Sequence, residues 1–424
     1  MNIYPLNDPS NYCAFIGIDW ADKKHDICIM VQGTRKMDHR VIEHNPQKID
    51  EWLQSLKKQF NGQRIAVGIE GSKGPLINLL VHYPFLTLFQ INPLSLSQYR
   101  KSFRVSSAKD DVNDSQLICE MVAKHMDRLR VIKADDEPTR ELKILSEQRR
   151  KIVQQRVGIV NQLKVHLKQY YPLALEVAGK ELYSKMSCEF LLKFSTHEQL
   201  SFTSDRGLKM FYQKQGCHSK TIDRKIQSIK EAKPLTVDNI LTENMAMTTR
   251  LYARMLLEIA ASVQEYDDKI QKKLSEHPDG HIFKSLPGAG SIFAARLASV
   301  YGSDRDKFPA SADVQKFSGV APITQKSGNT QAILFRFACP KFIRQTFVEF
   351  AESSIPYSIW AKAFYTMQKA KGKSYQMALR ALAFKWIRII TKCWKDNKPY
   401  NEVTYIKSLQ KRKSPLLKYL IEAT

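Results

Sequence analysis

Short runs of apolar and β-branched residues dominate the first 95 positions of the chain. Polar turns separate these runs, which is the pattern of β-strands, and the first three follow one another closely enough to form an antiparallel sheet. Two intervening stretches instead have helical periodicity. The expected strands are 14–19, 26–31, 38–42, 65–69 and 86–91, and the expected helices are 47–59 and 74–83.

The pattern becomes helical over a much longer range from Thr139 onward. Apolar residues recur every three or four positions up to about Tyr170, and again from Leu256 to Leu274. This periodicity predicts two long amphipathic helices. They could form an antiparallel hairpin within one chain or a coiled-coil seam between two chains, and the sequence leaves both open. Residues 171–245 between them have no clear pattern.

The predicted fold class is therefore α/β followed by α. Three sequential strands and then alternating helix and strand is the order of an RNase H-like domain. We expect such a domain first, then a helical or coiled-coil region with an insert, a mostly helical third domain and a basic helical tail. The expected boundaries are 10–132, 139–280, 281–355 and 356–424.

The charge of the chain favours a polyanionic partner. Its 424 residues carry a formal net charge of +24, and basic side chains bind nucleic acid by releasing counterions from phosphates. Half of the excess, +12, lies in residues 356–424, where Arg380 and Lys385 alternate with apolar residues at helical spacing. This pattern suits a helix that packs on one side and faces phosphate on the other, with a merely solvated face as the alternative.

Cysteine usage and hydropathy limit the location of the protein. The seven cysteines are scattered and never in Cys-x-x-Cys spacing, which predicts reduced thiols and no zinc site. The N-terminus lacks a basic and then apolar leader, and no uncharged apolar run reaches about 18 residues. We therefore expect a cytoplasmic protein with no membrane partner.

Four acidic residues form a candidate metal site. Asp19 and Glu70 each end a predicted apolar strand, so their carboxylates could meet at neighbouring strand ends. Asp111 and Asp114 lie three apart on the apolar face of a predicted helix, with no basic partner in that stripe. Such acids repel one another unless a cation is present, and Mg²⁺ or Mn²⁺ prefers oxygen ligands. Taken singly, each acid could instead cap a helix or a turn.

In this order the four acids resemble the motifs of the DEDD-type insertion-sequence transposases. These are relatives of Piv-type invertases and are described as bridge-RNA-guided recombinases. The resemblance covers roughly residues 10–170 and 245–405 and implies a RuvC-like, RNase H-related N-terminal domain. The matching residues are Gly17-Ile18-Asp19, Glu70, and the Lys-x-Asp-x-x-Asp pattern of Lys109, Asp111 and Asp114.

A second block resembles the C-terminal domain of the same family. Leu286-Pro-Gly-Ala-Gly290 is similar to a helix-hairpin-helix turn, and Lys326-Ser327-Gly328 matches the Ser-Gly motif that carries the nucleophile. A serine hydroxyl needs a base or a metal, and since no histidine lies nearby in sequence, we expect activation from the carboxylate–metal cluster. The expected nucleic-acid contacts are Gly288, Gly290, Lys326, Arg336, Lys341, Arg344 and Lys373.

The resemblance implies a transposase that cleaves and rejoins DNA through a serine-linked phosphodiester intermediate, assisted by Mg²⁺ or Mn²⁺. It also implies DNA partners at the element ends and the target, a guide RNA from the element, and a homodimer or homotetramer in a bacterial or archaeal nucleoid. One alternative is a RuvC-like junction resolvase that uses metal-activated water and leaves Ser327 idle. Another is a non-catalytic nucleic-acid scaffold.

Overall fold

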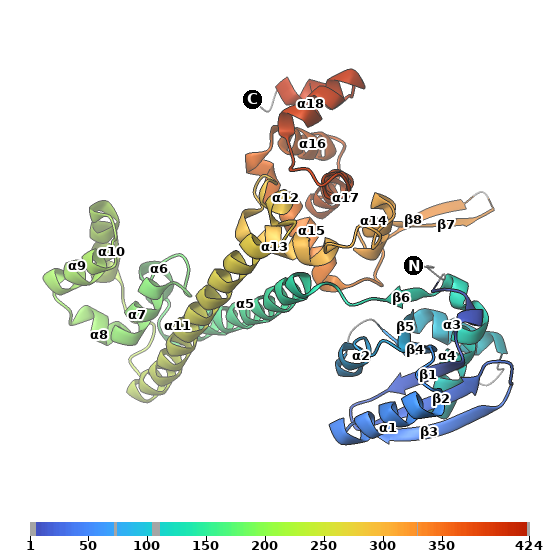
Figure 1. The fold of residues 1–424 in the computed structure, drawn as a ribbon. Coiled ribbons are helices and arrows are strands. Elements are labelled where there is room, and N and C mark those ends of the chain that lie inside the picture. Colours follow the sequence, from blue (N-terminus) through green and yellow to red (C-terminus); the bar gives the residue numbers. More distant parts are fainter. Residues whose placement is uncertain (1–5, 72–73, 104–110, 329, 422–424) are drawn as a thin grey trace. The chain divides into compact units, whose positions relative to one another are not determined.

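A computed structural model describes residues 6–71, 74–103, 111–328 and 330–421. The chain divides into two compact units, residues 1–134 and 135–424, and each contains two hydrophobic cores. The first unit is mixed α/β, and the described part of the second is helical apart from one β-hairpin (Figure 1). The expected subdivision of the second unit stays a prediction.

The first unit is built on a six-stranded mixed sheet with strand order β3-β2-β1-β4-β5-β6. The first three strands are antiparallel, β4 and β5 run parallel to β1, and β6 adds an antiparallel edge. This topology is consistent with an RNase H-like domain and confirms the five predicted strands, whereas β6 was not predicted. The strands are β1 (Ala14–Trp20), β2 (Lys24–Val31), β3 (Met37–Glu43), β4 (Ile65–Glu70), β5 (Leu86–Ile91) and β6 (Arg130–Ile132).

Helices cover both faces of this sheet. The first two helices, which were predicted, pack on the face that carries Ile16 and Ile18, and the other two pack on the face of Phe15. Helix α4 crosses β1 very closely, because a Cβ added to Gly17 would lie 2.0 Å from the Ser115 carbonyl oxygen. Only glycine permits this approach. The helices are α1 (Pro46–Gln59), α2 (Pro75–Leu80), α3 (Pro93–Phe103) and α4 (Asp111–His125).

Two long antiparallel helices organise the second unit. Helices α5 (Glu137–Tyr170) and α11 (Asn239–Glu276) pack against each other within the chain, and Arg149 forms an ion pair with Asp267 across them (Figure 1). The intrachain hairpin is thus confirmed. The region without a clear pattern between them folds as five short helices around an aromatic core. These are α6 (Leu173–Val177), α7 (Lys185–Lys193), α8 (His197–Ser201), α9 (Asp205–Lys214) and α10 (Ser219–Glu231).

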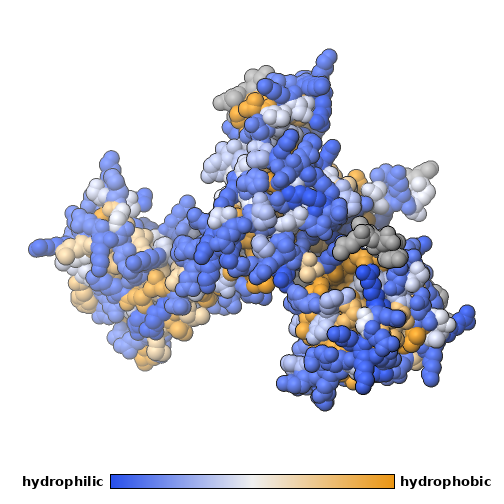
Figure 2. All heavy atoms as spheres, in the orientation of Figure 1, coloured by the Kyte–Doolittle hydropathy of each residue, from blue (hydrophilic) through white to orange (hydrophobic). Residues whose placement is uncertain are grey.

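The C-terminal part packs around three fully buried tryptophans, Trp360, Trp386 and Trp394. Across the described ranges, no helix has the length and apolar character needed to span a bilayer. Hydrophilic side chains cover most of the face shown in Figure 2, as the charge of the chain predicts. The elements are α12 (Gly280–Lys284), α13 (Gly290–Tyr301), α14 (Ser311–Phe317), β7 (Ile323–Ser327), β8 (Thr330–Leu334), α15 (Lys341–Ser354), α16 (Ile359–Ala370), α17 (Tyr375–Lys395), α18 (Glu402–Lys411) and α19 (Leu417–Ile421).

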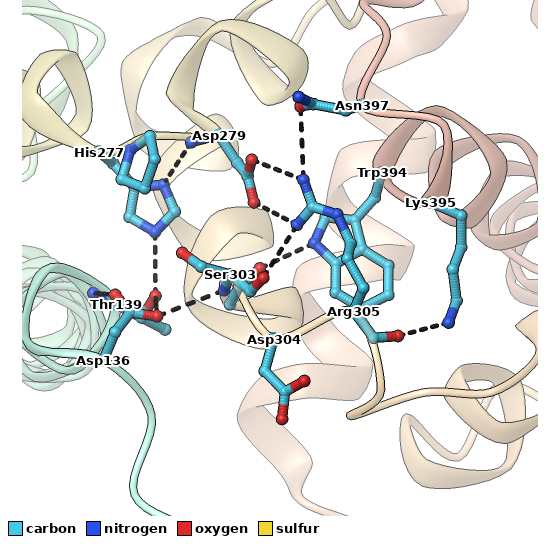
Figure 3. A network of polar contacts seen from close by, with 12 residues as sticks. Asp136, Thr139, His277, Asp279, Ser303, Asp304, Arg305, Trp394, Lys395 and Asn397 are labelled. Atoms are coloured by element: carbon cyan, nitrogen blue, oxygen red, sulfur yellow. Dashed lines mark hydrogen bonds and ion pairs between the residues drawn. The ribbon is translucent and has the colours of Figure 1, made fainter. Parts of the chain in front are cut away.

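A polar network joins the start of α5 to the end of α11 (Figure 3). The Asp279 backbone N–H donates to His277 Nδ1, so the neutral ring carries its proton on Nε2 and donates it to Thr139 Oγ1, 2.9 Å away. Thr139 in turn donates to Asp136. Burial lowers the pKa of His277, and the nearby carboxylates of Asp136 and Asp279 oppose this shift only in part.

The same network reaches the C-terminal helices through one arginine (Figure 3). Arg305 pairs with both carboxylate oxygens of Asp279, and its guanidinium lies 4.9 Å from the centre of the Trp394 ring. The Trp394 indole N–H donates to the Gly302 carbonyl at 2.7 Å. Polar contacts therefore hold the base of the long helical hairpin to the C-terminal core.

Candidate functional site

Strand register places the first two acids side by side. β1 and β4 run parallel with Ile18 opposite Ile69, so Asp19 and Glu70 are the next residues on adjacent strands. Neighbouring strands lie about 4.8 Å apart. Both residues are partly exposed at this end of the sheet. The expectation that these two acids occupy neighbouring strand ends is confirmed.

A third carboxylate belongs to the same row and was missed by the sequence analysis. Asp26 lies directly opposite Asp19 in the antiparallel β1–β2 pair, and opposed residues direct their side chains to the same face. The Asp26 side chain is only 9% exposed, and its carboxylate lies 3.6 Å from the Lys24 ammonium group. Counting back across the short turn between the two strands would have found this pairing.

The α4 face of the sheet carries this row of acids. Side chains alternate along a strand, so Asp19 shares the face of Phe15 and Gly17, which α4 covers. Cys119 of α4 lies beside Phe15, and Ser115 lies beside Gly17. The direction along β1 from Phe15 to Asp19 therefore corresponds to the direction along α4 from Cys119 towards its N-terminal turn.

Asp114, on that first part of α4, has a cationic partner that the sequence analysis did not foresee. The Arg100 guanidinium, from α3, contacts both oxygens of the Asp114 carboxylate, with Arg100 Nε 3.0 Å from Oδ1. Asp114 is 3% exposed, so the pair is well protected from solvent. The stripe on α4 has no basic residue, but the adjacent helix supplies one. An uncompensated negative charge is therefore not an argument for metal at Asp114.

The remaining acid can be placed only by its backbone. Asp111 is the first residue of α4, and its side chain lies outside the described part of the chain, as does Lys109. Among the described residues, no three Asp, Glu, His or Cys side chains converge on one point. The neighbouring pair, Asp19 and Glu70, supplies only oxygen donors, and this donor type fits Mg²⁺ or Mn²⁺.

Ser327 lies at the tip of an exposed β-hairpin. It ends β7 and pairs with Thr330 of β8, and Gly328 begins the connecting loop with φ of 54°. This hairpin extends away from the helical core of its unit (Figure 1). The Ser327 side chain is exposed and makes no hydrogen bond within the described ranges. The hairpin was not predicted, although Gly-Asn between β-type residues is a turn signal.

The two glycines of the predicted helix-hairpin-helix turn differ in their surroundings. The turn does connect two helices, α12 and α13, as expected. Gly288 has φ of 74° and packs inside the unit, where an added Cβ would lie 2.3 Å from the Ser353 carbonyl oxygen. Gly290 has φ of 53° and faces open space. Gly288 thus has a packing role, and Gly290 is the more accessible of the two.

Four of the five expected basic contacts fall into two groups. Lys326 and Lys341 are exposed. Arg336 and Arg344 are partly buried at the foot of the hairpin, where Arg336 donates to the Ala321 carbonyl at 3.3 Å and Arg344 donates to the Arg336 carbonyl at 3.1 Å. The fold therefore holds the two arginines in place. The remaining contact, Lys373, lines a pocket beside the hairpin.

Comparisons with known proteins agree with this arrangement. A family model for DEDD transposases of IS110 elements matches residues 16–172, and the model described as transposase IS116/IS110/IS902 family matches residues 280–366. The protein named as the mini-circle transposase for IS117, from Streptomyces coelicolor, is 24% identical over 92% of this chain and 95% of its own. The 42 kDa protein of insertion element IS900, from Mycobacterium paratuberculosis, is 21% identical over 92% of this chain and 97% of its own.

The two models match the parts of the chain that matter for the candidate site. The first includes the strand-end acids and α4, and the second includes the hairpin with Ser327. The relatives align over nearly their whole length, so the order of both blocks is shared. The chain belongs to the IS116/IS110/IS902 family of transposases, enzymes that cleave and rejoin DNA.

Proposed function

We propose that this transposase cleaves DNA through a covalent bond between Ser327 and the phosphate of a DNA strand. Ser327 Oγ attacks phosphorus and loses its proton, and the sugar oxygen of the broken bond leaves as a hydroxyl group. A sugar hydroxyl then attacks the serine-linked phosphodiester, which restores the DNA backbone and releases Ser327. The exposed position of Ser327 at the tip of the hairpin carries this proposal, because a DNA phosphate can reach the hydroxyl there.

The four acids are proposed to bind the divalent metal. The match to a DEDD transposase domain implies a metal-dependent, nuclease-like mechanism. Asp19, Glu70, Asp111 and Asp114 would hold Mg²⁺ or Mn²⁺, which would stabilise negative charge on the phosphate and favour the deprotonated hydroxyl. Asp114 would join them only after it exchanges Arg100 for the metal ion.

A covalent adduct assay tests the nucleophile. Wild-type protein, end-labelled element DNA and Mg²⁺ should give a protein–DNA adduct that survives denaturing electrophoresis, and Ser327→Ala should give none. Thr330→Ala is the matched control, since it removes the opposing hydroxyl from the same hairpin and should leave the adduct in place. An adduct with Ser327→Ala would contradict the proposal. Free nicked DNA without adduct in the wild type would support the resolvase alternative, and intact DNA would support the scaffold.

The proposed assembly contains a guide RNA encoded by the element and more than one copy of the chain. Support comes from the net charge of +24, of which half lies in the C-terminal 69 residues, and from the family resemblance. Sequencing of the RNA that copurifies with the protein, with light scattering before and after RNase treatment, tests both points. Recovery of only random host RNA, with an unchanged monomer mass, would contradict both.

A further inference from the structure

An open pocket of about 600 Å³ lies beside the β7–β8 hairpin. The end of β8 and the residue that follows it form one side, and α16 and α17 form the other. The volume falls within the range of about 300–1,000 Å³ that is typical of sites for small organic groups. The pocket therefore has room for a group the size of a nucleotide, close to the strand that ends at Ser327.

The walls of the pocket are mainly apolar and aromatic. Phe364 and Phe384 contribute rings, and Met377 contributes a thioether side chain that is 57% exposed. The exposed Met377 and the two partly buried rings together form an apolar surface that a ligand can cover with a gain in free energy. Nucleobases have flat faces that stack on aromatic side chains, whatever their sequence. These walls suit a base better than a sugar or a phosphate.

A buried amide provides the polar contact in this pocket. Gln368 is only 5% exposed, lines the pocket, and its side chain makes no hydrogen bond to any described residue. Its amide atoms are not among the buried, unpaired polar atoms of the described residues, so solvent reaches them within the pocket. A ligand that displaces this solvent must supply one donor and one acceptor to the amide. The edge of a nucleobase supplies both, and glutamine amides recognise base edges in this way.

Cationic side chains occupy the rim. Two guanidinium groups lie close to the Phe335 ring, that of Arg380 at 3.7 Å and that of Arg344 at 4.7 Å from the ring centre. Burial and the charge of Arg344 lower the pKa of Arg380, which remains protonated at neutral pH. Within the described ranges neither arginine pairs with a carboxylate, and Lys373 adds a third positive charge. A phosphate group would relieve the repulsion between these charges.

We propose that this pocket binds one unstacked nucleobase of the DNA strand that is cut, with the adjacent phosphate held by Arg380 and Lys373. The identity of the strand rests on the proposed function of Ser327. Binding of a base would anchor the strand beside the hairpin and fix which phosphate reaches the serine, as enzymes that act on extruded bases do. The pocket would thus position DNA relative to the nucleophile.

Photocrosslinking with the full-length protein tests the pocket directly. The probe is a single-stranded oligodeoxynucleotide of mixed sequence that carries 5-iodouracil, with an RNA of the same sequence and a fully paired duplex for comparison. We expect crosslinked peptides that contain Phe335, Phe364 or Met377. Crosslinks confined to other parts of the chain would overturn the proposal. Preferential crosslinking of the RNA at these residues would overturn the assignment to DNA.

Binding measurements with matched variants give a second readout. Gln368→Met and Phe335→Ala should each weaken single-strand binding by about tenfold and duplex binding by much less. Arg380→Gln should weaken single-strand binding more than Lys371→Gln, which removes an equal charge outside the pocket. Wild-type affinity in Gln368→Met and Phe335→Ala would overturn the proposal. Unfolding midpoints confirm folding, and the exposed Met377→Ala replaces any variant that fails to fold.

The adduct assay separates this proposal from the function of Ser327. If the pocket variants bind like the wild type while Ser327→Ala abolishes the adduct, only the pocket assignment fails. If the wild type forms no adduct while the pocket variants lose single-strand binding, the nucleophile assignment fails and base binding stands.

Discussion

The two groups of residues proposed to act in catalysis are held by very different kinds of backbone. Asp19 and Glu70 end adjacent central strands of a six-stranded sheet, and helices cover both faces of that sheet. Ser327 ends a strand that pairs, among the described residues, with β8 alone, and four of the five residues of this strand are exposed. A two-stranded hairpin has little stability of its own. The fold therefore fixes the acids through strand register, whereas the serine depends on the foot of its hairpin.

Loss of a strand-end acid should have the largest effect on activity. Asp19→Asn should reduce strand cleavage at saturating Mg²⁺ by about a thousandfold or more, because under the proposed function it removes a charged ligand from the metal ion that would stabilise the transition state. Unfolding midpoints should stay close to the wild type. Asp22→Asn, an exposed acid in the turn after β1, is the control and should cleave normally. Normal cleavage by Asp19→Asn would remove the carboxylate from the mechanism.

A pair of glycine substitutions compares the rigidity of the two regions. Gly17→Ala should destabilise the first unit by about 3 kcal/mol, because the new methyl group collides with the backbone of α4. Gly328→Ala should cost about 1 kcal/mol, since it strains only a left-handed backbone position with open space around it. Unfolding in urea, monitored by amide hydrogen exchange, measures the free energy of unfolding of each region separately. Equal losses would show that the hairpin is held as firmly as the sheet.

Removal of Arg100, the partner of Asp114, should show whether the Asp114 carboxylate then requires a metal cation. Arg100→Gln should destabilise the first unit by about 3 kcal/mol without divalent metal, because it leaves a buried carboxylate unpaired. Mg²⁺ should then raise the unfolding midpoint of the variant more than that of the wild type. Arg100→Gln with Asp114→Asn is the control and should lose this response. An identical Mg²⁺ response in variant and wild type would argue against metal at Asp114.

The smallest expected effect is a change in how the stability of the second unit depends on pH. Burial depresses the pKa of His277, so below the ordinary value of about 6.5 the unfolded chain takes up a proton that the folded chain does not. This contribution to stability is present above pH 6.5 and is lost as the pH falls, by about 1 kcal/mol over one pH unit. His277→Gln should therefore lose less stability between pH 7.5 and 5.5. A parallel loss in both proteins would contradict a neutral His277.

The comparison of the two regions also explains what the sequence could predict. Strands β1 and β4 were identifiable because each buries a continuous run of apolar residues, and the pairing of Asp19 with Glu70 followed from their strand-end positions. The partner of Asp114 was not identifiable, since α3 brings Arg100 to it through tertiary packing. Identification of Asp26 as a neighbour of Asp19 required the exact register of the β1–β2 pair.

The exposed elements were harder to predict from the sequence than the buried strands. Strands β7 and β8 contain no fully buried side chain, so they lack the buried apolar runs that identified β1 and β4. The pocket beside them draws residues from β8, α16 and α17, which are separated by tens of positions in the chain. The catalytic roles of Ser327 and of the four acids were inferred from the family resemblance and stay predictions.

The solitary position of the Ser327 hydroxyl has a consequence for the cell that carries this gene. Strands β7 and β8 contain no Asp, Glu or His that could serve as a base for Ser327, so the hairpin alone leaves the hydroxyl with the low reactivity of an ordinary alcohol. Newly made protein could then accumulate without damage to the chromosome. A mobile element survives only as long as its host does, and the proposed nucleophile, if it stays inert until the complete assembly forms, would limit the harm that excess expression can cause.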